Sequence, residues 1–311
     1  KMKTKKVLIT STSFAKADPS PIDLLMEDGW EIIRNKGPYE DEQLAKLIVD
    51  VEAIIVGNDI VGEKSISVAK KLKTIIVHGT GIDNIDSEAA ARIGISVLNT
   101  HHTNATAVAE FVFAALLSLT RHTHKGRESL QAGEWAGSSF AGMELERKVL
   151  GIIGFGHIGQ KTARIGLGFG MNVQYYDIMR NEMIENMQHI KYVELHELLK
   201  TSDIVVLHIP LLPETKNMIG ATELSMMKKT AILVNVSRGG IVSEDALIHA
   251  LSQKCLAGAV LDVFEEEPPK KSCQLLKMEN VLCTPHMAGY TIDALKKTSM
   301  ECAENLINAT K

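Results

Sequence analysis

Three glycines in the middle of the chain are spaced as in sites that hold a phosphate group. Gly154, Gly156 and Gly159 follow the apolar run Val149–Ile153 and precede a helical pattern. In a G-x-G-x-x-G motif the first glycine allows a tight turn, the second lets the backbone approach a pyrophosphate, and the third lets the helix pack closely on the strand. The N–H groups at the helix start then bind the phosphates. The motif therefore predicts a dinucleotide site.

Asp177 indicates which dinucleotide binds. It lies eighteen residues after Gly159, at the end of the apolar run Val173–Tyr176. A carboxylate at this place can accept hydrogen bonds from both hydroxyls of the adenosine ribose, and it repels a 2′-phosphate. The sequence therefore favours NAD over NADP as the cofactor. Arg180, three residues later, is the opposing signal, because an arginine nearby can accommodate a 2′-phosphate.

Three further polar residues each follow a short apolar run that is predicted to be a strand. They are Arg238, Asp262 and His286. In an open α/β sheet, ligands bind beyond the carboxyl ends of the strands. Taken singly, each has an ordinary explanation, namely a solvated loop arginine, an exposed acidic turn at Glu265–Glu267, and a histidine in a turn. Their occurrence together after a dinucleotide motif predicts an active site.

Short β-branched runs and longer amphipathic stretches alternate along the chain. The predicted strands are Lys6–Thr10, Ala53–Gly57, Thr74–His78, Ile95–Leu98, Val149–Ile153, Val173–Tyr176, Ile204–His208, Ala231–Asn235, Gly258–Leu261 and Val281–Thr284. Helical patterns cover Glu40–Val51, Ala105–His124, Ile158–Gly168, Glu244–Gln253 and Thr291–Asn308. Several of the strands are continuously apolar, as strands buried on both faces must be. This alternation predicts an α/β protein with parallel sheets.

The length of 311 residues predicts two domains, because it exceeds what one core usually holds. A second strand–helix series begins at Lys148. We expect one domain from residues 1–101 plus 291–311 and another from residues 102–290, with the last helix crossing back to the first domain. The pattern Ala105–His124 is apolar nearly all round, so we expect it to be packed between lobes or subunits.

Composition excludes several classes of function. With 34 Lys and Arg against 38 Asp and Glu, the net charge is −4, so no basic surplus is available for nucleic acid. No apolar run approaches the roughly 18–20 residues that span a bilayer, and we expect no membrane partner. The four cysteines fit neither a zinc site nor a disulfide framework, so we expect no metal and a reducing, cytoplasmic location. They are Cys255, Cys273, Cys283 and Cys302.

The strand-end residues resemble the signature of the NAD-dependent D-2-hydroxyacid dehydrogenases. Arg238 stands in Arg-Gly-Gly, Asp262 and Glu267 share one loop, and His286 follows Thr-Pro. The stretch His78–Asp86 fits the same family, and the resemblance covers essentially the whole chain. Within the family the chain is most similar to short-form D-3-phosphoglycerate dehydrogenases. The resemblance implies two doubly wound parallel-sheet domains, a flavodoxin-like substrate domain and a Rossmann NAD domain, with a cleft between them.

The resemblance also implies a role for each residue of the signature. Arg238 would bind the carboxylate and carbonyl oxygens of a 2-keto acid through its planar fork. His286 would protonate the carbonyl oxygen during reduction and take the proton back during oxidation. Glu267 would orient His286 and keep its proton available near neutral pH. Asp262 would anchor the nicotinamide carboxamide. A glutamate rather than a glutamine at position 267 argues against a formate dehydrogenase.

The remaining ligand-binding residues are also implied by the resemblance. The predicted cofactor residues are Thr80, Val108, Gly154, Gly156, His157, Ile158, Gly159, Asp177, His208, Pro210, Val236, Ser237, Asp262, Ala288 and Gly289. The predicted substrate residues are Asn58, His78, Gly79, Thr80, Gly81, Arg238 and His286. Backbone N–H groups around Thr80 and Gly81 would hold the substrate carboxylate. Family members commonly pair through the region of the long apolar helix, so we expect a homodimer.

The substrate class divides into two alternatives. Overall similarity favours 3-phosphoglycerate and 3-phosphohydroxypyruvate, and with them serine biosynthesis. Phosphoglycerate dehydrogenases typically place arginine near the phosphate, however, and the loops at Val56–Ile60 and Val77–His78 have none. Lys64, His78, His101, His102 or a basic residue of a partner subunit would have to replace it. Hydroxypyruvate or glyoxylate is the alternative, since neither carries a phosphate.

A function other than catalysis is also compatible with these residues. C-terminal-binding corepressors share this fold, carry the same Arg, Glu and His, and bind NAD(H) chiefly to control their assembly. Fold and motif together do not separate such a scaffold from an enzyme. Oxidation of NADH in the presence of a 2-keto acid does.

Overall fold

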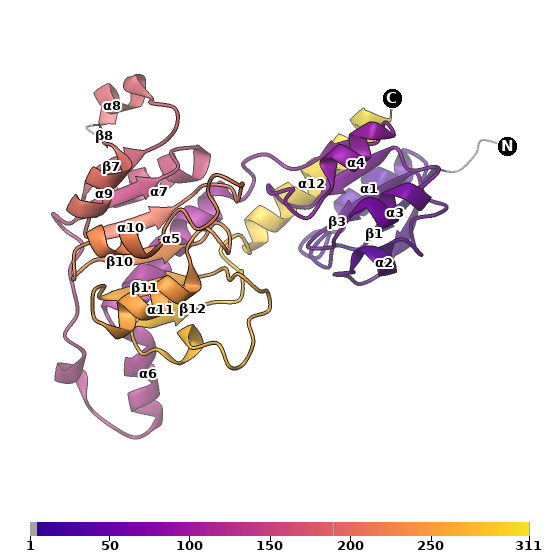
Figure 1. The fold of residues 1–311 in the computed structure, drawn as a ribbon. Coiled ribbons are helices and arrows are strands. Elements are labelled where there is room, and N and C mark those ends of the chain that lie inside the picture. The colour runs from indigo at the N-terminus through magenta and orange to yellow at the C-terminus, as the bar shows by residue number, and fades with distance from the viewer. Residues whose placement is uncertain (1–4, 189, 311) are drawn as a thin grey trace. The chain divides into compact units, whose positions relative to one another are not determined.

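The chain folds into two compact units (Figure 1). The structure, a computed structural model, describes residues 5–188 and 190–310. Unit 1 contains residues Lys1–Asn104 and Tyr290–Lys311, and unit 2 contains Ala105–Gly289. Each unit is built on one parallel β-sheet, with five strands in unit 1 and seven in unit 2. The predicted α/β class with two parallel-sheet domains is confirmed.

The sheet of unit 1 has the strand order β2-β1-β3-β4-β5, which is the flavodoxin-like order. Its strands are β1 Lys5–Ile9, β2 Trp30–Arg34, β3 Ala53–Val56, β4 Thr74–Val77 and β5 Ser96–Leu98. The helices of this unit are α1 Ser20–Glu27, α2 Asp41–Leu44, α3 Glu63–Val68, α4 Ser87–Arg92 and α12 Ile292–Ala309. All strand pairs are parallel, so the carboxyl ends of all five strands lie at one edge.

Alternating side chains of the strands bury both faces of this sheet. Val7 and Ile9 of β1 pack with Leu25 of α1 and Leu306 of α12. Leu8 points to the opposite face, where it joins the core formed with α2, α3 and α4. Successive residues of a strand point to opposite faces, which is why both faces are apolar and covered.

The sheet of unit 2 has the order β12-β11-β10-β9-β6-β7-β8, a Rossmann arrangement extended by one strand. Its strands are β6 Val149–Ile153, β7 Asn172–Tyr176, β8 Lys191–Tyr192, β9 Ile204–Leu207, β10 Ile232–Asn235, β11 Gly258–Leu261 and β12 Val281–Cys283. The helices are α5 Ala105–Thr120, α6 Thr123–Gln131, α7 His157–Gly168, α8 Glu182–Gln188, α9 Leu195–Thr201, α10 Ala221–Met226 and α11 Glu244–Ser252, with the short 3-10 helices η1 Gly137–Phe140 and η2 Leu275–Lys277. The order reverses between β6 and β9, where dinucleotides bind in such sheets.

The long apolar helix α5 belongs to the core of unit 2. Val112, Phe113 and Leu116 are buried against the sheet and against α7. The helix therefore packs within unit 2, against α7 and the sheet, and its contact with another lobe or subunit stays a prediction. The helix also ends earlier than predicted, at Thr120, and His122 adopts a left-handed conformation with φ of 54° before α6 begins.

Two strands were not predicted, and a second helix is shorter than predicted. β2 and β8 lie at sheet edges; β2 includes the polar residues Glu31 and Arg34, and β8 has only two residues. The pattern Glu40–Val51 forms an α-helix only to Leu44, because the next turns close with hydrogen bonds to the third residue back, as from the N–H of Leu47 to the carbonyl of Leu44. Leu44, Ile48 and Val51 still face the core.

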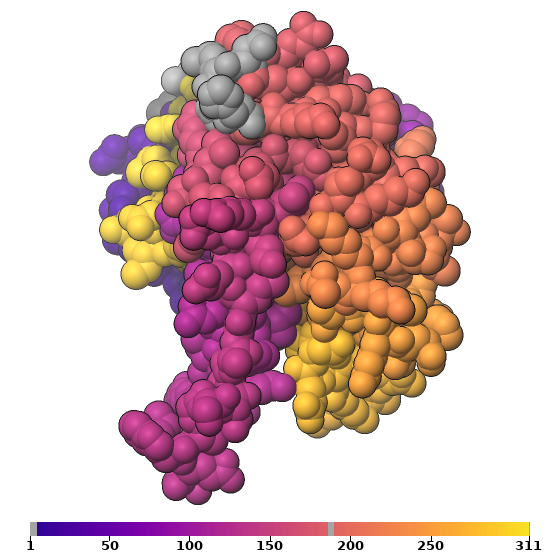
Figure 2. All heavy atoms as spheres, turned by 90° about the vertical axis from the view of Figure 1, so that its left-hand side faces the viewer, coloured from indigo at the N-terminus to yellow at the C-terminus, as the bar shows by residue number. Residues whose placement is uncertain are grey.

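The segment of α6 and η1 protrudes from the body of unit 2 (Figure 2). Just before η1, Trp135 is 94% exposed. Within the described part of the chain, no helix is both long and apolar enough to cross a membrane.

Candidate active site

The glycine loop joins β6 to α7, and two of its three glycines are required by close contacts with the backbone. Gly154 has a φ of +95°, and a Cβ there would lie 2.5 Å from the carbonyl oxygen of His208. A Cβ on Gly159 would lie 2.3 Å from the carbonyl oxygen of Gly154. Both positions therefore exclude a side chain. Beside Gly156 a Cβ would meet no atom within 4 Å, so the start of α7 faces open space.

This loop fits the pyrophosphate of a dinucleotide. The twelve-residue helix α7 begins at His157, directly after Gly156 and its open space, and the N–H groups at a helix start are where a phosphate binds. His208 follows β9, and its partly buried imidazole is hydrogen-bonded through Nε2 to Oγ1 of Thr162 in α7 at 2.9 Å. Burial lowers the pKa of His208 to about 3, so the imidazole is neutral at neutral pH.

Asp177 is bound to the glycine loop by its own side chain. It follows β7, and its Oδ2 accepts a hydrogen bond from the backbone N–H of Phe155 at 2.6 Å. Its Oδ1 accepts one from the N–H of Met179 at 3.0 Å. The contact between Asp177 and Phe155 holds the predicted ribose-binding carboxylate at the carboxyl edge of the sheet, next to the predicted pyrophosphate site.

Three other predicted cofactor residues lie in a single buried cluster. Val108, Val236 and Ala288 come from α5, from the loop after β10 and from the loop after β12, and they pack in the same core as Phe155. Ile158 packs against this core from α7. Pro210 is exposed in the loop after β9, where its carbonyl accepts a hydrogen bond from Thr215 Oγ1 at 2.7 Å.

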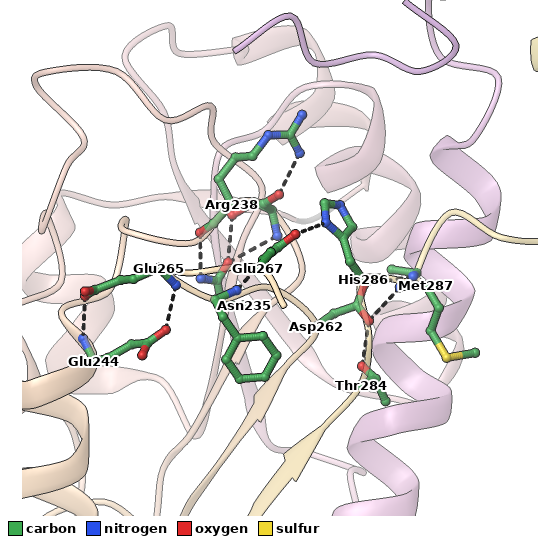
Figure 3. Close-up of polar contacts among 12 residues, drawn as sticks. Asn235, Arg238, Glu244, Asp262, Glu265, Glu267, Thr284, His286 and Met287 are labelled. Carbon is green, nitrogen blue, oxygen red and sulfur yellow. Dashed lines mark hydrogen bonds and ion pairs between the residues drawn. The ribbon is translucent and has the colours of Figure 1, made fainter. Parts of the chain in front are cut away.

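His286 and Glu267 form a hydrogen-bonded pair at the carboxyl edge of the sheet (Figure 3). Nδ1 of His286 lies 2.7 Å from Oε2 of Glu267. The two side chains are 39% and 33% exposed, so solvent and small molecules reach the pair. The other carboxylate oxygen of Glu267 accepts a hydrogen bond from the N–H of Phe264 at 3.0 Å. Both oxygens of Glu267 are therefore held by donors.

The ionisation of Glu267 fixes the direction of this hydrogen bond. Burial by itself would raise the pKa of Glu267, but the hydrogen bond from His286, the positive charges of His286 and Arg238, and the N–H of Phe264 bring it below its ordinary value. The carboxylate is ionised at neutral pH and is an acceptor only. Nδ1 of His286 therefore carries a hydrogen, and Nε2 is the ring nitrogen left to exchange a proton with a ligand.

Arg238 is held beside this pair by the loop that follows β10 (Figure 3). Its Nη1 donates to the carbonyl of Ser237 at 2.7 Å. The side chain of Asn235, which is 2% exposed, donates to the carbonyl of Arg238 at 2.9 Å and accepts from the N–H of Ser237 at 3.1 Å. A Cβ on Gly239 would lie 1.7 Å from the carbonyl oxygen of Phe264, so only glycine lets this loop approach the loop that carries Glu267.

Asn235 and Gly239 are two positions that the residue patterns did not single out. Both hold the backbone on which Arg238 stands. The available signal was an amide at the end of the otherwise apolar strand Ile232–Asn235, because a polar side chain buried at a strand end normally bonds to the next loop.

Asp262 is fully buried, and its carboxylate organises the loop that carries His286. Oδ1 accepts hydrogen bonds from Thr284 Oγ1 at 2.6 Å and from the N–H of Met287 at 2.9 Å, and Oδ2 accepts one from the N–H of Ala288 at 2.8 Å. His286 itself has a φ of 49°, a left-handed conformation that is unfavourable for a residue with a Cβ. The bonds to Asp262 stabilise that turn. The predicted contact between Asp262 and a nicotinamide stays a prediction.

A small pocket of about 70 Å³ lies at the carboxyl edge of the sheet in unit 1. Residues 10–13, all serine or threonine, line it together with Gly57–Asp59, His78 and Tyr290. Among the described residues that line this pocket there is no lysine or arginine. The carboxylate of Asp59 is buried beneath it and accepts hydrogen bonds from Thr10 Oγ1 at 2.7 Å and from the N–H of Gly57 at 3.0 Å.

His78 is a neutral wall of this pocket. Its Nδ1 lies 3.0 Å from Ser13 Oγ, and its Nε2 lies 2.9 Å from Ser299 Oγ of α12. Burial lowers the pKa of His78 to about 4, so the imidazole carries no charge at neutral pH. Two other proposed cations are already paired, since Lys64 bonds to Glu42 and His101 lies 3.8 Å from the carboxylate of Glu301.

The other predicted substrate residues are at or near the surface of unit 1. Asn58 and Thr80 are exposed, while Gly79 and Gly81 are partly buried. Asn99 Nδ2 donates to the carbonyl of Thr80 at 2.5 Å, which ties the loop after β4 to the end of β5.

A larger cavity, of about 550 Å³, lies at the opposite edge of the sheet in unit 2. Its lining includes Leu256, Ala257 and Asn280, which precede β11 and β12. The predicted catalytic residues follow strands and therefore lie at the other edge. In the described part of the chain, no three His, Cys, Asp or Glu side chains are grouped as a metal site would need.

Comparison with known proteins relates these features to a family. Residues 113–288 match the family model described as D-isomer specific 2-hydroxyacid dehydrogenase, NAD binding domain. The chain is 39% identical over 292 residues to D-3-phosphoglycerate dehydrogenase of Methanocaldococcus jannaschii, covering 91% of this chain and 56% of that protein. The chain thus spans little more than half the length of that relative.

A second relative and a solved structure match over most of their lengths. Glyoxylate reductase of Thermococcus litoralis is 41% identical over 297 residues, which cover 92% of this chain and 89% of that protein. The crystal structure of the TT0316 protein from Thermus thermophilus matches with a TM-score of 0.89 and 32% identity, covering 98% of this chain and 96% of that one.

Proposed function

The chain belongs to the family of D-isomer specific 2-hydroxyacid dehydrogenases, and from this premise we propose that it interconverts a D-2-hydroxy acid and its 2-keto acid. Its cofactor is NAD, which accepts or supplies the hydride when bound. The observation that carries the proposal is the hydrogen-bonded pair of His286 and Glu267 beside Arg238, on the same sheet as the glycine loop.

The roles of the three residues follow from their contacts. The ionised carboxylate of Glu267 keeps the hydrogen on Nδ1 of His286, so Nε2 exchanges the proton with the substrate. During reduction the imidazolium donates the Nε2 hydrogen to the carbonyl oxygen, and during oxidation Nε2 takes the hydroxyl proton. Arg238 binds the carboxylate and the carbonyl oxygen of the keto acid, and its positive charge stabilises negative charge that develops on that oxygen.

The residues of unit 2 fit NAD. The open space beside Gly156, the start of α7 and the carboxylate of Asp177 would hold the pyrophosphate and the adenosine ribose. The buried cluster of Val108, Val236 and Ala288 would provide an apolar surface for the ring of the nicotinamide.

We propose a small, unphosphorylated 2-keto acid, glyoxylate or hydroxypyruvate, as the substrate. The predicted substrate residues Asn58 and His78 line a pocket of hydroxyl groups above the buried Asp59, and His78 is neutral. Hydroxyl groups can hydrogen-bond to the uncharged end of a keto acid that lies away from its carboxylate. A phosphate dianion placed near a carboxylate and without a cation would bind poorly.

Phosphoglycerate is the second candidate. The similarity to a D-3-phosphoglycerate dehydrogenase over 91% of this chain favours it. In that case the phosphate needs a cation from outside the pocket, and the exposed Arg34, which donates to the carbonyl of Phe14 at 2.8 Å, is one source within unit 1. A place in serine biosynthesis would follow from this candidate alone.

One kinetic experiment tests the reaction and separates the substrates. The purified chain is assayed for oxidation of NADH with glyoxylate, hydroxypyruvate, pyruvate and 3-phosphohydroxypyruvate, and kcat/KM is compared. We expect the unphosphorylated acids to be turned over fastest. A kcat/KM at least tenfold higher for phosphohydroxypyruvate would select the second candidate. If no acid supports NADH oxidation, the chain is not an enzyme of this class, and a nucleotide-binding scaffold is left.

We also propose that the protein is a homodimer in the cytoplasm. The protruding segment around Trp135, which is 94% exposed, offers an apolar surface to a second copy. All four cysteines carry free thiols, which suits a reducing compartment. Light scattering at micromolar concentration tests the dimer, and a monomer there would contradict it.

A further inference from the structure

Arg180, the residue whose position raised the alternative of NADP, is engaged in an ion pair with Glu185. Its Nε lies 2.9 Å from Oε1 and its Nη2 lies 3.0 Å from Oε2, so both carboxylate oxygens are used. The guanidinium also lies over the ring of Tyr192 in β8, 5.6 Å from the ring centre. The side chain is therefore directed towards α8 and β8, which Figure 1 shows next to β7.

Glu185 is itself fixed from the core of unit 2. Its Oε1 accepts a hydrogen bond from the hydroxyl of Tyr175 at 3.0 Å, and that hydroxyl accepts one from the N–H of Asn181 at 2.7 Å. Tyr175 is fully buried, and the side chain of Glu185 is only 14% exposed. The hydrogen bond from Arg180 outweighs partial burial and lowers the pKa of Glu185, so the pair stays charged at neutral pH.

Asp177 and Arg180, at the two ends of the segment 177–180, differ in whether they are available to a bound nucleotide. Asp177 is held against the glycine loop through the N–H of Phe155. Arg180, three residues later, is bound to α8 by two hydrogen bonds, and a guanidinium in a bidentate pair gives up both of them if it turns to another anion. A carboxylate is thus available where the ribose is expected, while Arg180 is occupied by Glu185.

We propose that Glu185 is a specificity-determining residue that favours NAD over NADP by keeping Arg180 from binding a 2′-phosphate. The proposal rests on the proposed function, since it assumes that the nucleotide binds at the glycine loop with its ribose at Asp177. Glu185 acts through Arg180 and contacts neither substrate nor reacting atoms. Discrimination against NADP then has two sources, repulsion by Asp177 and the withdrawal of Arg180.

The test replaces Glu185 by glutamine. Glu185→Gln keeps the volume and an acceptor for the hydroxyl of Tyr175, but it removes the charge that holds Arg180. Dissociation constants for NADH and NADPH are measured by fluorescence titration, and kcat/KM is measured with each. We expect NADPH to bind about three- to tenfold tighter, with NADH changed less than about twofold, because one charged contact with a phosphate becomes available.

The effect is expected to be larger when Asp177 no longer repels the phosphate. In Asp177→Ala, adding Glu185→Gln should strengthen NADPH binding about tenfold or more, because the released arginine then meets no competing carboxylate. Adding Arg180→Met to this double variant should abolish the gain. A gain that persists without Arg180 would overturn the proposal.

Two matched controls separate the ion pair from a general change of charge. Glu182 begins α8, and its charge also acts on Arg180, but both ion-pair bonds of that guanidinium go to Glu185. Glu182→Gln removes the same charge without releasing Arg180, so an equal gain in NADPH affinity there would refute the proposal. Arg180→Met in the otherwise unchanged protein should leave NADPH affinity unaltered, and a loss would mean that Arg180 already binds the phosphate.

The outcome for Glu185 is distinguishable from failure of the proposed function. If the unchanged protein binds NADH and oxidises it with a keto acid, but Glu185→Gln gains no NADPH affinity, the specificity role is wrong and the enzyme assignment stands. If the unchanged protein binds no NADH, the proposed function fails first. A thermal melt of Glu185→Gln close to that of the unchanged protein shows that the variant is folded.

Discussion

Replacing Glu267 by glutamine tests the central hydrogen bond of the site. The glutamate accepts from His286 Nδ1 at 2.7 Å with one oxygen and from the N–H of Phe264 at 3.0 Å with the other. Glutamine has one oxygen and one NH2 group, so it can accept from only one of these two donors. If the glutamine oxygen faces His286, its NH2 group faces the N–H of Phe264, and two donors meet. If the NH2 group faces His286 instead, the histidine must carry its hydrogen on Nε2 rather than on Nδ1. In both cases the imidazolium loses a negatively charged partner.

The size of the effect follows from the geometry and exposure. Two unit charges about 4 Å apart attract by about 4 kcal/mol at an effective dielectric constant of about 20. Because both side chains are about one third exposed, solvent reduces this to the roughly 1.5–3 kcal/mol of a hydrogen bond to a charged group. We therefore expect kcat for reduction at neutral pH to fall about ten- to hundredfold in Glu267→Gln.

The pH profile identifies the cause of that fall. Reduction needs hydrogens on both ring nitrogens of His286, and the ionised carboxylate of Glu267 stabilises this positively charged ring. The ratio of the reductive rates of the unchanged protein and of Glu267→Gln should therefore depend on pH. Oxidation, which needs the neutral imidazole, should be affected less. Because the pKa of Glu267 is below its ordinary value, its contribution is present at neutral pH and is lost only as the pH falls through that lowered value.

A neighbouring carboxylate supplies the control for this experiment. Glu265 lies in the same loop, but it is exposed and accepts a hydrogen bond from the N–H of Glu244, away from His286. Glu265→Gln should leave the reductive pH profile in place. If Glu267→Gln kept both the rate and the profile, or if Glu265→Gln shifted the profile equally, the assignment of Glu267 as the partner of the catalytic histidine would be refuted.

Three further predictions concern the acid–base group, the loop of Arg238 and the pocket of unit 1. His286→Ala should lower kcat by about two to four orders of magnitude while the NADH dissociation constant barely changes, as stopped-flow and titration would show. Gly239→Ala, which places a Cβ 1.7 Å from the carbonyl oxygen of Phe264, should cost about 2 kcal/mol or more in urea unfolding, whereas Gly126→Ala, with no atom within 4 Å, should not destabilise the fold. The pKa of His78 falls from 6.5 to about 4 on folding, so unfolding should become easier by about 3 kcal/mol as the pH drops from 6.5 to 4, and a His78→Gln variant should lack that part of the pH dependence.

Local patterns predicted most of the elements, and the exceptions have physical causes. Buried strands such as Ile204–Leu207 are continuously apolar, and their type was evident. Edge strands such as β2 and β8 have one neighbour or very few residues, so they leave little apolar pattern. The pattern of the long apolar helix α5 predicted a helix, but it did not predict which elements pack around it. Hydrophobicity on all sides shows that a helix is covered and does not show by what.

For the site, the amino-acid sequence by itself determined the residue types and the strand ends on which they stand. Glycines 154, 156 and 159, an acid at 177, and the arginine, glutamate and histidine after the later strands were all readable, because parallel strands bring their carboxyl ends to one edge. The family resemblance also implied the pairing of Glu267 with His286, which the structure contains. Only the tertiary structure decided that Arg180 turns to Glu185 and that His78 lies partly buried between two serines and is therefore neutral. Hydrogen bonds and burial depend on distances between segments far apart in the chain, and local spacing carries no information about those distances.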